Sequence, residues 1–235
     1  MTTTQLAAEP LVLVVDDSAT SRVVVERQLK KLGCNVSTAQ DGASGLAAMA
    51  KTEFDLVLLD CQMPDMSGYE VAMQVRRRER ADESAHTPII AISAETDAAH
   101  MQKCLDSGMD GVLGKPLPVD ELKKILSLWC DVDADAGIAA SPATSVDEMQ
   151  GVDLQALFRT TSLEDFSAMR DLLAQADLPG VGRMAHRMKG AALTMGAAQI
   201  VGTLERIEAI AIRKTAPASG LNAEVETLKQ QLQAI

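Results

Sequence analysis

Short apolar runs alternate with helical patterns along the first half of the chain. The runs contain few polar residues, which is typical of parallel strands that are covered on both faces. We expect strands at residues 11–15, 35–39, 55–59, 88–93 and 111–114. Between them apolar residues recur at helical spacing, as at Val24, Leu29 and Leu32. Strand and helix in repeated alternation predict an α/β domain with a doubly wound five-stranded parallel sheet over residues 1–129.

The pattern changes at Cys130. Residues 130–147 are rich in Asp, Ala, Ser, Gly and Pro and have little to bury, so they predict a flexible linker. Over residues 148–235 the strand signals stop and the helical periodicity continues, with breaks at residues 178–182, near Gly196 and at residues 217–220. This predicts a C-terminal all-α domain, an antiparallel bundle of about four helices.

Composition and charge exclude several classes of function. The chain has 235 residues, 22 Lys and Arg against 33 Asp and Glu, a net charge of −11 and 2% aromatic residues. This acidity disfavours nucleic-acid binding, and too few aromatic residues are present for base stacking. No apolar run is long enough to span a bilayer, and residues 1–10 do not have the pattern of a secretory signal. We therefore expect a cytoplasmic protein without nucleic-acid or membrane partners.

The cysteines and two of the histidines suggest no metal chemistry. The four cysteines lie far apart in the sequence: Cys34, Cys61, Cys104 and Cys130. Their spacing is not that of a zinc cluster, so we expect reduced thiols and interpret Cys61 as a small buried apolar residue. His86 and His100 have no partner pattern, and we assign them no role.

Charged and polar residues stand where the predicted strands end. They are Asp16, Asp17, Asp60, Ser93 and Lys115. The carboxyl ends of parallel strands meet at one edge of a sheet, so we expect these side chains to converge. Three close carboxylates repel one another unless a cation lies among them, and an oxygen-rich site with room for water suits Mg²⁺. A carboxylate beside Mg²⁺ can act as nucleophile toward a phosphoryl group, whose oxygens the ammonium and the hydroxyl would bind.

Each of these residues also has a structural interpretation. Asp16 and Asp17 can be an N-cap pair for a helix that begins near Ser18. Lys115 can be a solvated lysine in a loop. Taken alone, neither position decides between structure and chemistry.

His186 is the informative residue of the second domain. A stripe of apolar residues marks the core face of its helix: Val181, Met184, Met188, Ala191 and Met195. At about 100° per residue His186 then points away from the core, into solvent. Gly182 and Gly190 stand one turn to either side and would clear space for an approaching protein, and Lys189 is within reach of a phosphoryl group on the imidazole. A neutral imidazole is a good nucleophile near pH 7, but an exposed histidine without function is the alternative.

Four stretches in order carry a resemblance to a known family: VVDDS, LLDCQMPDMSG, AISAE and GKP. Residues 11–129 resemble a response-regulator receiver domain, which has a flavodoxin-like fold. The resemblance implies that Asp60 is the phosphoacceptor and that Ser93 and Lys115 respond to the phosphoryl group. It implies a Mg²⁺ site made of Asp16, Asp17, Asp60 and the backbone carbonyl of Gln62. It also implies a cis peptide between Lys115 and Pro116, while the usual aromatic residue three positions before the lysine is Val112 here.

The stretch from His186 through Lys189 and Gly190 to Gly196 resembles the motif of histidine-containing phosphotransfer (HPt) domains. The resemblance covers roughly residues 152–235. It implies that His186 is phosphorylated, that Lys189 assists and that Gly190 provides clearance. Members of this family often have a small extra helix at the start, followed by a longer second helix. Here residues 152–176 are the only stretch that can form both of these helices.

The resulting hypothesis is a phosphorelay. A partner histidine kinase phosphorylates Asp60, the group passes to His186, and then to an aspartate of a downstream response regulator. One alternative is a docking protein in which His186 is idle. Another is a phosphatase with an aspartyl nucleophile of the haloacid-dehalogenase type, although that family has Asp-x-Asp after its first strand and this chain has adjacent aspartates. The chain can also be the C-terminal piece of a larger hybrid kinase.

Overall fold

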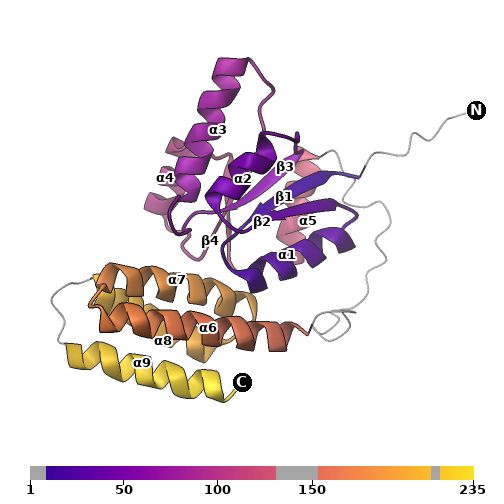
Figure 1. Ribbon diagram of the computed structural model, residues 1–235. Helices are drawn as coiled ribbons and strands as arrows, with labels where there is room; N and C mark the ends of the chain where they lie inside the picture. Colours follow the sequence, from indigo (N-terminus) through magenta and orange to yellow (C-terminus); the bar gives the residue numbers. More distant parts are fainter. Residues whose placement is uncertain (1–8, 131–152, 213–217) are drawn as a thin grey trace, which may run out of the picture.

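The computed structural model describes residues 9–130, 153–212 and 218–235, which fold into a sheet domain and a helical bundle (Figure 1). Apart from Cys130, the expected linker at residues 130–147 lies outside the described residues. The strands of the sheet are β1 (Leu11–Val15), β2 (Asn35–Ala39), β3 (Leu56–Asp60), β4 (Ile89–Ser93) and β5 (Gly111–Gly114). They are all parallel, in the order β2-β1-β3-β4-β5, which confirms the doubly wound, flavodoxin-like prediction.

Helices cover both faces of the sheet. The helices are α1 (Ala19–Lys31), α2 (Gly42–Met49), α3 (Gly68–Asp82), α4 (Ala98–Asp106) and α5 (Val119–Trp129). Leu13 and Val57 face α2, α3 and α4, whereas the neighbouring Val14 and Leu58 face α1 and α5. The alternation of a strand's side chains therefore builds two cores, and both faces are apolar because both are covered.

The described part of the second domain is a bundle of four helices. They are α6 (Leu154–Ala174), α7 (Leu178–Thr194), α8 (Ala198–Ile212) and α9 (Ala218–Gln233). The break expected at residues 178–182 was wrong, because α7 begins at Leu178. Asp177 caps it by accepting a hydrogen bond of 3.0 Å from the Gly180 N–H, and Pro179 lies in the first turn, where a missing N–H is tolerated. Val181 and Met188 pack in the bundle core, as their spacing predicted.

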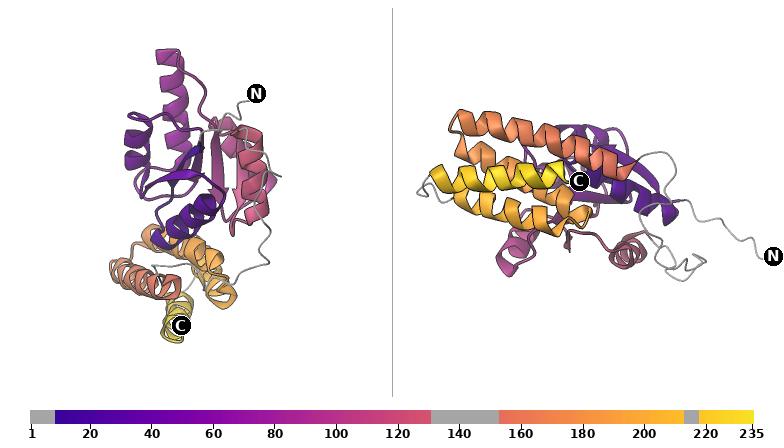
Figure 2. Two further views of the ribbon diagram at one scale, coloured as in Figure 1. Left: turned by 90° about the vertical axis from the view of Figure 1, so that its right-hand side faces the viewer. Right: turned by 90° about the horizontal axis from the view of Figure 1, so that it is seen from below.

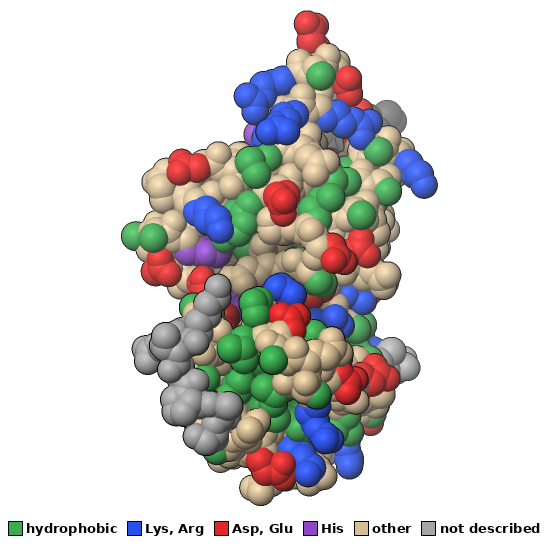
Figure 3. All heavy atoms as spheres, turned by 60° about the vertical axis from the view of Figure 1, so that its left-hand side comes forward, with side chains coloured by type: hydrophobic (Ala, Val, Ile, Leu, Met, Phe, Trp, Pro, Cys, Tyr) green, Lys and Arg blue, Asp and Glu red, His purple; other side chains and the backbone are tan. Residues whose placement is uncertain are grey.

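The bundle lies against the sheet domain through α6 and α7, which contact α1 (Figures 1 and 2). Hydroxyl pairs cross this interface: Thr20 with Thr161 at 3.2 Å and Ser21 with Thr194 at 3.3 Å. Acidic and basic side chains gather where the two domains meet (Figure 3). Among the described helices, none is both long and apolar enough to cross a bilayer.

Candidate functional site

Three carboxylates converge at the carboxyl end of the sheet. Asp16 and Asp17 follow β1 and Asp60 ends β3; all three are buried, with carboxylate oxygens within 4.8 Å of one another. The Lys115 ammonium donates to Asp16 Oδ2 at 2.8 Å and to Asp60 Oδ2 at 2.5 Å. Its side chain is only 5% exposed, so the solvated-loop interpretation of this lysine was wrong. The convergence expected from the strand ends is confirmed for these four residues.

Local structure fixes the two acidic loops. Ser18, not an aspartate pair, caps α1, and Asp16 Oδ1 accepts a hydrogen bond of 2.8 Å from the Ser18 N–H. At the start of α3, a Cβ added to Gly68 would lie 2.2 Å from the backbone oxygen of Asp60. Only glycine therefore allows α3 to approach the end of β3 so closely.

The remaining expected residues of this site lie on the adjoining connections. The Gln62 N–H donates to Asp60 Oδ1 at 3.0 Å. Ser93 ends β4, is buried, and its hydroxyl accepts a hydrogen bond of 3.1 Å from the Glu95 N–H. The peptide bond between Lys115 and Pro116 is cis, as the resemblance implied.

The cluster holds more negative charge than its own cations offset. Burial, together with the charges of Asp60 and Asp16, raises the pKa of Asp17 to about 7. Burial also raises the pKa of Asp16. Burial alone would lower the pKa of Lys115, but attraction to Asp16 and Asp60 outweighs it and raises that pKa. Oxygen ligands with this unmet charge fit a hard divalent cation such as Mg²⁺.

We expect the stability of the metal-free protein to depend on pH through Asp17. Its pKa of about 7 lies above the ordinary value of 3.8, so between these values the folded state binds more protons than the unfolded state. The free energy of unfolding then falls as pH rises through that window. In EDTA, the Tm of the sheet domain should drop by roughly 5 °C between about pH 5 and 8. Mg²⁺ should abolish the drop and Asp17→Asn should flatten it; an equal slope in Asp17→Asn would contradict the assignment.

His186 lies between the two domains. His186 was expected to be exposed, but only 6% of its surface is accessible to solvent. Its surroundings explain the difference. One of its ring nitrogens lies within 4.8 Å of carboxylate oxygens from both domains, those of Glu208 on α8 and Glu95 after β4. His186 is not part of the apolar core of the bundle. It leaves its own core as predicted, but the sheet domain covers it.

Glu208 is a site residue that the sequence analysis missed. Its carboxylate accepts a hydrogen bond of 2.8 Å from His186 Nδ1 and one of 2.6 Å from Lys189 Nζ. Burial would raise the pKa of Glu208, but these two donors outweigh burial and lower it. A carboxylate that accepts from Nδ1 leaves Nε2 as the nitrogen with the free lone pair. The sequence did contain a signal for Glu208, because this acidic residue stands next to the core positions Ile207 and Ala211 of α8.

Residues of α7 also reach the acidic cluster. Arg187 Nε lies 3.7 Å from Asp17 Oδ2 and 3.4 Å from Asp165 Oδ2. A Cβ on Gly190 would lie 3.3 Å from Lys115 Nζ, so this glycine faces the sheet domain, as predicted. Gly182 was expected on the same face, but a Cβ there would contact Ala211 of α8 at 3.4 Å, so that expectation was wrong.

A cleft of about 550 Å³ opens between the domains. Residues from both domains line it, among them Asp17, Gln62 and His186. The acidic loops and the imidazole therefore face one shared space.

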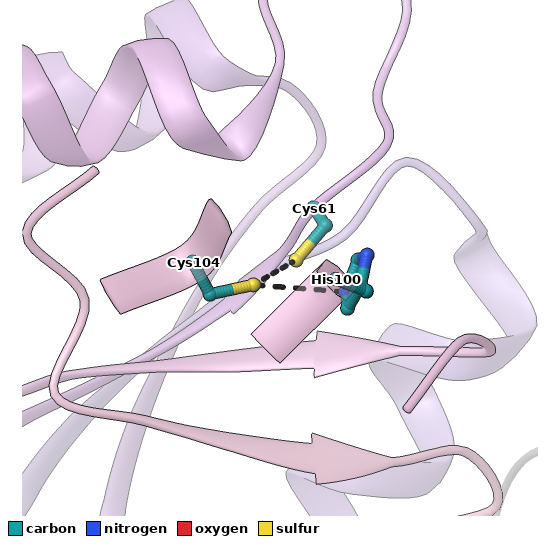
Figure 4. Close-up of side chains that lie close together, drawn as sticks. All are labelled: Cys61, His100 and Cys104. Carbon is teal, nitrogen blue, oxygen red and sulfur yellow. Dashed lines mark hydrogen bonds between the residues drawn. The ribbon is translucent and has the colours of Figure 1, made fainter. Parts of the chain in front are cut away.

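The cysteines are reduced thiols, as expected, but two of them lie close together in the structure. Cys61 is buried, as expected, and Cys104 is buried too. Their Sγ atoms lie 3.6 Å apart, and Cys104 Sγ lies 3.6 Å from His100 Nε2 (Figure 4). The fold brings together side chains that are far apart in the sequence, because Cys61 follows β3 and the other two stand on α4.

Family models match most of the chain. Residues 12–127 match the response regulator receiver domain and residues 153–235 match the Hpt domain. The virulence sensor protein BvgS of Bordetella pertussis is 33% identical over 252 residues, which covers 95% of this chain and 20% of BvgS. The chain therefore spans about a fifth of the length of this relative.

Two solved structures resemble the first domain. The receiver domain of the sensor histidine kinase PA1611 from Pseudomonas aeruginosa, solved with magnesium coordinated in its active-site cleft, is 30% identical, with a TM-score of 0.48. It covers 53% of this chain and 100% of its own. A chain in the co-crystal structure of the Saccharomyces cerevisiae phosphotransfer protein Ypd1 with the Ssk1 receiver domain is 26% identical, covers 54% of this chain and 92% of its own, and has a TM-score of 0.50. The chain is a receiver domain followed by an Hpt domain and belongs to the two-component phosphorelay proteins.

Proposed function

We propose that Asp60 accepts a phosphoryl group from a partner histidine kinase, and that His186 takes it over and passes it to an aspartate of a downstream response regulator. One observation carries this proposal: α7 docks on the acidic end of the sheet, so Asp17, Gln62 and His186 line one cleft. The contact of Arg187 with Asp17 supports the same docking. In this contact a basic side chain next to the histidine faces the acidic cluster, so the two surfaces have complementary charge.

The transfer step is an in-line displacement. His186 Nε2 attacks the phosphorus of phosphorylated Asp60; the P–N bond forms as the P–O bond breaks, and the carboxylate leaves with the bonding electrons. Glu208 holds the Nδ1 proton and stabilises the positive charge that develops on the ring.

The receiver residues neutralise the phosphoryl oxygens. Lys115 and Ser93 bind them by charge and by hydrogen bonding. Asp17, Asp60 and the carbonyl of Gln62 would hold Mg²⁺, with Asp16 directly or through water. When bound, the ion supplies positive charge to the phosphoryl oxygens.

We expect Glu208→Gln to slow transfer from Asp60 to His186 by roughly 10- to 100-fold. The amide removes the charge that orients the imidazole and lets either ring nitrogen carry the proton. Rapid-quench labelling of the full chain measures the rate. The control is Glu205→Gln, an exposed glutamate on the same helix. A wild-type rate in Glu208→Gln would show that Glu208 does not position the ring.

A larger side chain at Gly190 should separate the two domains. The Lys115 ammonium next to Gly190 is held by two aspartates, which resist its displacement, so Gly190→Leu should slow transfer within the chain by roughly 10-fold or more. Gly202→Leu is the matched control, because a Cβ at that position of α8 has its nearest neighbour, Arg206 Nη1, at 3.6 Å. Equal rates in the two variants would contradict a docked transfer within the chain.

A further inference from the structure

Three side chains between the end of β3 and α4 are of the types that bind metal ions in proteins. Cys61, Cys104 and His100 offer two sulfurs and one imidazole nitrogen, and these ligand atoms all lie within 4.8 Å of one another. The mechanism above uses none of them. All three are buried, and both cysteines are fully so.

The distances between the ligand atoms match the edges of a zinc tetrahedron. Zn–S bonds of about 2.3 Å and Zn–N bonds of about 2.0 Å place neighbouring ligand atoms about 3.5–3.8 Å apart. Here the Sγ atoms of Cys61 and Cys104 are 3.6 Å apart, and Cys104 Sγ is 3.6 Å from His100 Nε2. The three side chains point toward one another in Figure 4.

Tyr69 supplies a hydrogen bond to the imidazole of such a site. Its hydroxyl lies 3.1 Å from His100 Nδ1, and its side chain packs in the same core cluster as Cys61 and Cys104. With the proton on Nδ1 donated to the tyrosine oxygen, Nε2 presents its lone pair to the cluster. A hydrogen bond that orients a metal-binding imidazole in this way is common around metal centres.

The charge of the site and its position next to the cleft are also compatible with Zn²⁺ binding. Two thiolates and one neutral imidazole around Zn²⁺ form a neutral group, which a buried position tolerates. Cys61, Tyr69 and Lys103 belong to the lining of the interdomain cleft, so the cleft ends next to the cluster, although both sulfurs are buried. The fourth position would be taken by water, as in open zinc sites with three protein ligands.

We propose that Cys61, Cys104 and His100 bind one Zn²⁺ ion, which ties α4 to the end of β3. Binding replaces two thiol protons: Zn²⁺ and two S–H groups give two Zn–S bonds and two released protons. The site is separate from the acidic cluster, whose oxygen ligands suit a harder ion.

Co²⁺ titration of the full chain tests the proposal, with excess Mg²⁺ present to fill the acidic cluster. We expect one equivalent of Co²⁺ to produce a thiolate-to-cobalt charge-transfer band, and one equivalent of Zn²⁺ to remove it. Cys104→Ser should lose the band. Cys34→Ser should keep it, because Cys34 is a buried cysteine in the core on the opposite face of the sheet. No band in the wild type, or an unchanged band in Cys104→Ser, would overturn the proposal.

A measurement on the wild type covers the case in which Cys104→Ser does not fold. Zinc K-edge absorption of the protein with one equivalent of Zn²⁺ should show two sulfur neighbours at about 2.3 Å and lighter atoms at about 2.0 Å. A shell of only oxygen and nitrogen atoms would place the ion elsewhere and refute the site.

Discussion

Asp60→Asn should remove phosphate from both domains at once. In a reaction fed by the partner kinase, we expect labelling of the chain to fall below about 1% of wild type, at Asp60 and at His186 alike. The amide keeps an oxygen that can accept from the Gln62 N–H, but it cannot attack phosphorus as a carboxylate does. Lys115 still has Asp16 as a partner, so the variant should fold.

The readout separates the two sites by chemistry. An acyl phosphate on Asp60 is lost in base and a phosphohistidine is lost in acid, so quenching under each condition assigns the label. Asp65→Asn is the matched control, because Asp65 is exposed in the same loop and its φ of 64° suits asparagine. Label that still reaches His186 in Asp60→Asn would mean that phosphate enters the Hpt domain by another route.

His186→Gln should separate acceptance from relay. We expect wild-type labelling of Asp60 and loss of labelling of the downstream receiver to below about 1%. Glutamine can still donate a hydrogen bond to Glu208, so the bundle keeps its packing, but it offers no nucleophilic nitrogen. The assay is transfer of label from the kinase through this chain to the downstream receiver.

The control for this variant is His86→Gln, a half-exposed histidine that contacts Asp110 in the sheet domain. It should behave as wild type. If the downstream receiver is still labelled in His186→Gln, the chain is a docking protein with an idle histidine, and the relay proposed here is wrong.

The strand runs and the residues that follow them predicted most of the fold and the acidic cluster. The β1 and β3 runs are apolar on both faces, and their ends had to meet once the sheet was parallel. Three boundaries differed by one residue: β3 spans Leu56–Asp60 rather than residues 55–59, and β4 begins at Ile89 rather than at residue 88.

The errors arose where distant segments meet. Helical periodicity correctly turned His186 away from its own core, but periodicity carries no information about a second domain that covers it. Glu208 was missed because it stands on another helix. Cys61 and Cys104 are 43 positions apart, and only the packing of α4 against the end of β3 brings their sulfurs together.

Transfer within the isolated full chain is the most direct test of the central claim. Asp60 is loaded with labelled phosphate from a small acyl phosphate in Mg²⁺, the donor is removed, and both sites are mapped over time. We predict that base-labile label on Asp60 declines as acid-labile label on His186 rises, with one rate constant that does not change with protein concentration. Loss of the Asp60 label solely as inorganic phosphate, with His186 unlabelled throughout, would contradict the account.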